Sequence, residues 1–186
     1  MAYISQFVAR SDVNLNDLGE CHRFVCSLFP NEGETSGPRI SPLHYKNGNQ
    51  FITLTRTSPL DLPSLNVRTK LFDPKIENGW QLQFHLKANP TTSINRRRIP
   101  VLGEKNRLDW LKKVLATSGC ELAKAHICAY CVERGLHRSW EKPMTFNSVT
   151  FRGLLRVKDK DNLLDSVKRG FGRGKAYGFG LLLFVR

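Results

Sequence analysis

The stretch GFGRGKAYGFG, residues 170–180, connects two segments whose patterns are easy to read. Before it, residues 159–168 place three aliphatic side chains at helical spacing after an acidic start, which predicts a short helix. After it, residues 181–185 form an apolar run with the length of a buried strand. The glycine-rich stretch is therefore predicted to be a helix-to-strand connection with unusual backbone angles.

The same stretch carries the residue types that bind phosphate. Glycines at alternating positions, such as Gly172 and Gly174, let the backbone approach a phosphate closely and offer N–H groups to it. Arg169, Arg173 and Lys175 add positive charge. The stretch is not a Walker loop, since no Ser or Thr follows the lysine, and it does not lead from a strand into a helix as a dinucleotide fingerprint does. A plain tight connection remains the alternative for its last glycines.

Around this stretch, the second half of the chain alternates strands and helices. Residues 80–88 alternate apolar and polar side chains without a break, which is typical of a strand. Leucines at helical spacing predict a helix over residues 104–118, which Gly119 ends. Two further strands are predicted over residues 121–132 and 145–157. The order is strand, helix, strand, strand, helix, strand.

The first half repeats this order. Strands are predicted over residues 3–9 and 66–72, a helix over residues 18–28, and a hairpin around Asn47-Gly48. Prolines make a second helix near residues 59–65 short or absent. We therefore expect an α+β protein made of two tandem ferredoxin-like (RRM-like) domains, residues 1–76 and 77–186, with a glycine-rich loop near the C-terminus.

The net charge is strongly positive, and the excess lies in the second half of the chain. The 186 residues carry 29 basic and 16 acidic side chains, for a net charge of +13. Residues 1–84 are balanced, whereas residues 85–113 and 150–186 each hold an excess of six positive charges. Such a field is typical of a protein that binds a polyanion, most often nucleic acid. A basic surface that only aids solubility is the alternative.

Other features narrow the class of protein. A hydrophobic content of 40% indicates a globular chain, and no apolar run approaches the ~20 residues of a membrane span. Five irregularly spaced cysteines and an N-terminus unlike a signal peptide indicate a reduced, cytoplasmic setting. Cys128 and Cys131 have the spacing of zinc ligands, but no second pair follows, so we expect no metal and no cofactor.

Four segments together resemble a known family. HRFVCSLFP (residues 22–30), FHLKANP (84–90) and FRGLL (151–155) stand in the same order, ahead of the glycine-rich tail, as in the repeat-associated mysterious proteins of CRISPR systems. The first two segments are similar to those of the CasE subfamily, the precursor-RNA endoribonucleases of type I-E systems. The resemblance covers residues 3–185.

This resemblance implies a metal-independent cut within a repeat stem-loop of CRISPR precursor RNA. The upstream 2′-hydroxyl attacks the phosphate, which gives a 2′,3′-cyclic phosphate and a 5′-hydroxyl. Proton transfer requires a group that titrates near pH 7, and His22 stands at the matching position. Without the resemblance, a lone histidine at the edge of an apolar helix face is more often structural. The family often has a tyrosine three residues earlier, where this chain has Gly19.

The resemblance also implies the residues that hold RNA. From residue type rather than from the resemblance, Arg23, Arg173 and Lys175 are the candidates to stabilise charge on the phosphate. Lys175 ranks first because the glycine-rich turn is expected to bring it to the domain junction beside His22. Residues 91–100 correspond to a hairpin that grips RNA, and a triple-arginine turn suits phosphate pairing. The predicted RNA-binding residues are Arg23, Lys87, Asn89, Arg96, Arg97, Arg98, Arg169, Gly172, Arg173 and Gly174.

The expected partners are the repeat RNA and the other subunits of the Cascade surveillance complex, in which such proteins stay bound to the mature guide RNA. No membrane partner is expected. Two alternatives stay open at this point. One is a non-catalytic RNA-binding subunit of the same fold, in which His22 is structural. The other is a general basic RNA-binding or ribosome-associated protein.

Overall fold

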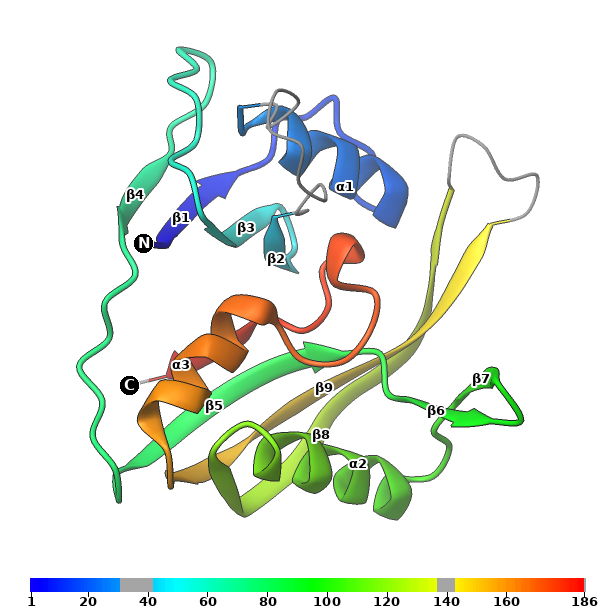
Figure 1. Cartoon of the computed structure of the whole chain (residues 1–186). Coiled ribbons are helices and arrows are strands. Elements are labelled where there is room, and N and C mark those ends of the chain that lie inside the picture. Colours follow the sequence, from blue (N-terminus) through cyan, green and yellow to red (C-terminus); the bar gives the residue numbers. More distant parts are fainter. Residues whose placement is uncertain (31–41, 137–142, 186) are drawn as a thin grey trace.

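A computed structural model describes residues 1–30, 42–136 and 143–185. Its first sheet has the strand order β2-β3-β1-β4, with antiparallel pairs throughout, and α1 packs against it (Figure 1). The elements are β1 (Tyr3–Val8), α1 (Leu18–Ser27), β2 (Leu43–Asn47), β3 (Gln50–Thr55) and β4 (Arg68–Leu71). Residues 59–65, with their two prolines, form no helix.

The second sheet has the equivalent order β10-β5-β9-β8, again antiparallel. Its elements are β5 (Gln81–Ala88), α2 (Glu104–Ala116), β8 (Cys120–Gly135), β9 (Met144–Val157), α3 (Lys160–Arg169) and β10 (Leu182–Val185). In both sheets the first and third strands are central, which is the ferredoxin-like arrangement. The predicted fold class of two tandem ferredoxin-like units is therefore confirmed.

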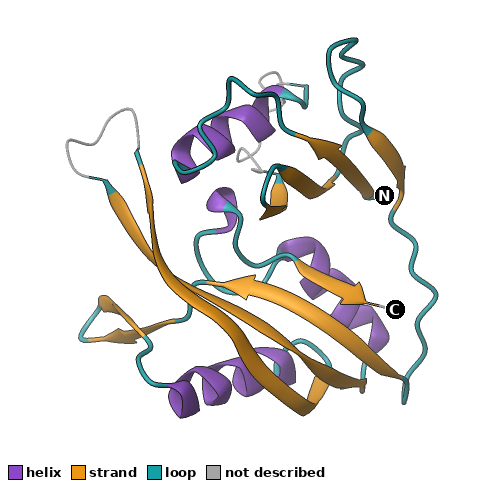
Figure 2. Ribbon diagram, turned by 180° about the vertical axis from the view of Figure 1, so that it is seen from behind, coloured by secondary structure: helices purple, strands orange, loops and turns teal. Residues whose placement is uncertain are grey.

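The two units share one apolar core. Leu43 and Leu54 of the first sheet belong to the same buried cluster as Phe84 and Phe151 of the second sheet. The helices α2 and α3 contribute Leu111 and other fully buried side chains to that cluster. The predicted boundary between residues 76 and 77 falls in the segment between β4 and β5, where Ile76 is itself buried. Figure 2 shows the first sheet above the second, with α1 packed beside the first sheet.

A two-stranded hairpin projects from the second unit between β5 and α2 (Figure 1). It consists of β6 (Thr91–Ile94) and β7 (Arg97–Pro100). Asn95 and Arg96 form its turn with positive φ angles of 49° and 63°, which matches the mirror-image turns that join twisted strands. The hairpin that the family resemblance implied is thus present, with Arg96 in the turn and the other two arginines on β7.

The strand β8 is longer than predicted. The alternating pattern ends at Val132, yet pairing with β9 continues to Gly135, opposite Met144. This extension carries the β8–β9 hairpin up to α1, where Leu136 donates its backbone N–H to Asp17 Oδ1 at 3.2 Å. Among the described residues, no helix is long and apolar enough to cross a membrane.

Candidate active site

His22 lies on α1 at the junction of the two units. The helix starts at the side chain of Asp17, which accepts hydrogen bonds from the backbone N–H groups of Gly19 and Glu20 at 2.6 and 3.1 Å. The buried face of α1 includes Cys21 and Val25, and His22 stands beside it, only partly buried. One turn later, Cys26 Sγ lies 3.5 Å from His22 Nδ1.

The glycine-rich loop reaches this helix through a short 3-10 turn, η1 (Lys175–Tyr177). Gly174 and Gly178 flank the turn with φ angles of 77° and 84°, a conformation that side chains disfavour. Gly178 also packs closely on β2, since a Cβ atom there would lie 3.1 Å from His44 Nε2. Both views show the turn directly below α1 (Figures 1 and 2). The loop therefore presents η1 to the helix that carries His22.

The residue that the turn brings to His22 is Tyr177. The two ring centroids are 5.5 Å apart, with the planes at 47°. Behind Tyr177, Phe146 of β9 lies at 5.0 Å and itself contacts Phe179 at 5.3 Å. Sequence reasoning missed Tyr177 and Phe146. The available signal was that Tyr177 is the one tyrosine within the glycine-rich stretch.

Lys175 shares the turn with Tyr177, but its ammonium points back to the C-terminal end of α3. Lys175 Nζ donates a hydrogen bond to the Arg169 carbonyl at 2.6 Å. Burial lowers the pKa of Lys175 below its ordinary value, and the charges of Arg169 and Arg173 lower it further. The Lys175 ammonium is therefore bound to the end of α3, and Tyr177 is the residue of the turn that contacts His22.

Arg23 and Gly19 complete the helix side of the site. Arg23 pairs with Glu20 at 2.5 Å, and both side chains are partly exposed. Burial raises the pKa of Tyr177, while the Arg23 guanidinium acts to lower it. A Cβ atom at Gly19 would lie 2.0 Å from the carbonyl oxygen of Leu136, the residue after β8, so no side chain fits where the family resemblance expects a tyrosine.

A basic groove of about 440 Å³ begins next to this site. Arg98 of the β6–β7 hairpin and Arg173 of the glycine-rich loop line it, together with Gly174 and Phe146. Phe146 therefore belongs both to the groove and to the ring contacts that lead to Tyr177 and His22. The hairpin and the glycine-rich loop, far apart in the sequence, form one surface.

Two predicted RNA-binding residues, Lys87 and Asn89, lie at the base of the groove and are largely buried. Lys87 forms an ion pair with Glu133 at 2.8 Å, with only 13% of its side chain exposed, and its ammonium lies 5.3 Å from the Phe179 ring. Asn89 is buried, accepts a hydrogen bond from the Asn147 backbone, and pairs its backbone with Arg173. Both residues therefore anchor the groove in this structure.

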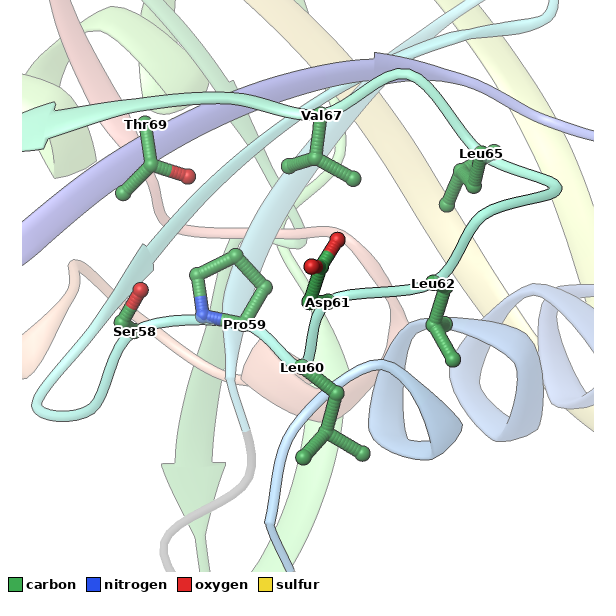
Figure 3. A pocket seen from close by; sticks show the side chains of 8 residues that line it. All are labelled: Ser58, Pro59, Leu60, Asp61, Leu62, Leu65, Val67 and Thr69. Carbon is green, nitrogen blue, oxygen red and sulfur yellow. The ribbon is translucent and has the colours of Figure 1, made fainter.

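A second hollow lies under the chain between β3 and β4 (Figure 3). Five of its eight lining residues are apolar, and its one charged residue is Asp61, whose carboxylate repels phosphate. None of the predicted site residues lines it.

The cysteines flagged in the sequence lie on β8, where Cys128 and Cys131 are exposed. No cluster of three or more metal-ligating side chains occurs within the described ranges. Of the nearby histidines that could ligate zinc with these cysteines, His126 is exposed on β8 and His137 lies outside the described residues.

Known proteins resemble this chain along most of its length. Residues 4–186 match the family described as "CRISPR associated protein". The CRISPR system Cascade subunit CasE of Escherichia coli is 26% identical over 184 residues, covering 89% of this chain and 90% of that protein. The CRISPR-associated endoribonuclease Cse3 of Thermus thermophilus is 29% identical over 125 residues, 61% of this chain and 59% of that protein.

Solved structures agree on the fold. A structure of the CRISPR endoribonuclease Cse3 bound to 19 nt RNA superposes with a TM-score of 0.85 at 24% identity, covering 100% of this chain and 98% of that one. The CRISPR-associated protein Cas6e of Escherichia coli superposes with a TM-score of 0.74 at 23% identity, over 100% and 99% of the two chains. The chain therefore belongs to the CRISPR associated protein family, within the CasE and Cse3 group to which its sequence motifs pointed.

Proposed function

We propose that this chain is an endoribonuclease that cuts CRISPR precursor RNA within the repeat stem-loop and then stays bound to the guide RNA as a Cascade subunit in the cytoplasm. The names of its relatives, a Cascade subunit and an endoribonuclease, support this class of activity. The observation that carries it is the continuity between His22 and a basic groove, through the rings of Tyr177 and Phe146.

The chemistry requires a 2′-hydroxyl to attack the neighbouring phosphorus while the bond from phosphorus to the 5′-oxygen breaks. One proton leaves the attacking oxygen and one reaches the departing oxygen. His22 is the group assigned to this proton transfer, because an imidazole exists in both protonation states near pH 7. The products are a 2′,3′-cyclic phosphate and a 5′-hydroxyl, and no metal ion takes part.

Negative charge that develops on the phosphate requires cations nearby. Arg23 lies one residue after His22 and is partly exposed, so we assign it to this role together with Lys175. The Lys175 ammonium must first exchange the Arg169 carbonyl for a phosphate oxygen. Its lowered pKa reflects burial and two neighbouring arginines, an environment that an anionic ligand would relieve.

The groove and the hairpin are assigned to RNA binding. Arg96, Arg97 and Arg98 are exposed on the hairpin, and Arg173 and Gly174 face the hairpin across the groove. Arg169 ends α3, and Gly172 lies on the glycine-rich loop that follows. Lys87 and Asn89 are assigned to holding the groove in shape rather than to a free cationic surface, because both are already paired.

Cleavage of the cognate repeat RNA in the presence of EDTA tests this function. The expected result is a single cut whose 5′ fragment ends in a 2′,3′-cyclic phosphate, with no effect of Mg²⁺. A same-length RNA whose stem has been scrambled is the control and should remain intact. Strict Mg²⁺ dependence contradicts the mechanism. Tight stem-loop binding without any cut supports a non-catalytic RNA-binding subunit, and equal binding of both RNAs supports a general RNA-binding protein.

A further inference from the structure

We propose that Tyr177 is a positioning residue that holds the His22 imidazole in place through its ring, not through its hydroxyl group. The inference rests on the proposed function, since it assigns a second residue to the same reaction. It starts from the tilted ring contact of 5.5 Å between a residue on α1 and a residue 155 positions later on η1.

The first step is that Tyr177 is itself firmly held. Its ring packs on Phe146 at 5.0 Å, and Phe146 packs on the fully buried Phe179. On either side of η1, Gly174 and Gly178 adopt left-handed backbone angles that glycine allows. Both pack closely, since a Cβ atom would lie 2.9 Å from Phe179 at Gly174 and 3.1 Å from His44 at Gly178. These ring contacts and the close packing of the turn leave the tyrosine ring little freedom to rotate away.

The second step is that the imidazole is contacted from two sides. Cys26, one turn later on the same helix, places its thiol 3.5 Å from Nδ1, and Tyr177 places its ring against the imidazole from the glycine-rich loop. A histidine that is only partly buried on a helix surface otherwise samples several rotamers. Contact with the tyrosine ring restricts those rotamers, which favours catalysis because the proton acceptor must lie within hydrogen-bond reach of the reacting oxygen.

The third step concerns the hydroxyl group. Burial raises the pKa of Tyr177, so the hydroxyl stays protonated at neutral pH and is a poor proton donor as well. The aromatic contacts with His22 and Phe146 involve the ring. A phenylalanine therefore retains the function, and a small side chain loses it.

The position of Tyr177 also connects binding to chemistry. The loop that carries it supplies Arg173 and Gly174 to the groove. RNA that binds these residues stabilises the loop, and the loop in turn stabilises the ring beside His22. Through Tyr177, RNA that is bound in the groove thus helps to keep the His22 imidazole in its active rotamer.

The test compares Tyr177→Phe, Tyr177→Leu and Tyr177→Ala with the wild type, using single-turnover cleavage of the repeat stem-loop at saturating protein. Tyr177→Ala is expected to cut ~10–100-fold more slowly, because small misplacements of a catalytic group are that costly. Tyr177→Phe should stay within about 3-fold of wild type, and Tyr177→Leu should fall between them. Stem-loop affinity should change little. Tyr3→Ala, on β1, is the matched control and should cut normally.

A second measurement uses histidine-labelled protein without RNA. The NMR signals of the His22 ring, assigned with His22→Gln, should move in Tyr177→Ala and Tyr177→Leu because the ring current is lost, and stay nearly unchanged in Tyr177→Phe. Unmoved His22 signals or an undiminished rate in Tyr177→Ala overturns the proposal. A Tyr177→Phe variant as slow as Tyr177→Ala also overturns it, because the hydroxyl would then be required.

These outcomes differ from a failure of the proposed function. If the wild-type protein does not cut RNA, or His22→Gln cuts at the normal rate, the proposed function is wrong for His22. In that case the NMR comparison still reports whether the tyrosine holds the imidazole.

Discussion

The two parts of the candidate site, the surroundings of His22 and the basic groove, differ in the chemistry and exposure of their side chains. His22 contacts the Cys26 thiol and the ring of Tyr177, and Tyr177 packs in turn on Phe146. In the groove, by contrast, the arginines of the hairpin and Arg173 are exposed to solvent. Proton transfer benefits from a fixed geometry, whereas phosphate binding benefits from accessible charge. The difference indicates that rate and affinity reside in separate side chains, which mutations can address one at a time.

The largest effect is expected at the junction. His22→Ala should slow single-turnover cleavage by ~10²–10⁴-fold, the usual value of a general acid–base group. Stem-loop affinity should stay within a few-fold, because the charged groove is intact. His126→Ala, an exposed histidine on β8, is the matched control. Near-normal cutting by His22→Ala would mean that another residue performs the proton transfer. A loss of affinity as large as the loss of rate would contradict the assignment of rate and affinity to separate side chains.

The next effect is expected in the groove. Replacing Arg96, Arg97 and Arg98 by Ala should weaken stem-loop binding by ~10²-fold. It should also flatten the dependence of log K on log salt, because a variant that contacts fewer phosphates releases fewer counterions from the RNA when it binds. At saturating protein the bound RNA should be cut at nearly the wild-type rate. Titrations at several salt concentrations measure both quantities. An unchanged slope would mean that the hairpin does not contact phosphates and that the glycine-rich loop holds the RNA.

The sequence predicted most of the fold because its elements are local. Residues 80–88 alternate without a break, and β5 occupies Gln81–Ala88. The prolines near residue 60 correctly indicated a missing helix. The extension of β8 to Gly135 was missed, because the periodic pattern stops at Val132 and only pairing with β9 carries the strand onward.

The site was less predictable, because its contacts join distant residues. His22 and Tyr177 are separated by 155 positions, and no local pattern relates them. Lys87 illustrates the opposite case. It carries the right charge for RNA, but its partner Glu133 lies 46 positions away, so the sequence could not show that the charge is already paired. Residue type predicted which groups are present, and tertiary packing decides which of them are accessible.

Acid should lower the free energy of unfolding through His44, the buried histidine of β2. Burial lowers the pKa of His44 to about 3, against a backbone contact with Pro42 that raises it. The unfolded chain protonates this histidine near pH 6.5, so the unfolded state takes up more protons as the pH falls from about 6.5 to about 3. Stability should therefore decrease across this window, by up to about 1.4 kcal/mol per pH unit from this group.

The measurement is the free energy of unfolding against pH for wild type and His44→Gln. Because His85 also has a lowered pKa, only the difference between the two proteins reports on His44. The variant should show the shallower decline with acid. Parallel curves would mean that the residue is not held neutral, and that the support of the η1 turn by β2 is weaker than its contact with Gly178 indicates.

The smallest expected effect separates two neighbouring arginines of the same hairpin. Adjacent residues of a strand face opposite sides. Both arginines pair with β6, Arg98 opposite Ser93 and Arg97 opposite Ile94, but Arg98 lines the groove and Arg97 does not. Arg98→Ala should therefore weaken stem-loop binding by ~10-fold and lower the salt slope by about 1, whereas Arg97→Ala should cost only ~2-fold. Each variant differs from wild type by one charge on the same strand, so each is the control for the other. Equal losses would mean that RNA contacts both faces of the hairpin, and the region that grips RNA would then be the whole hairpin rather than the groove beside His22.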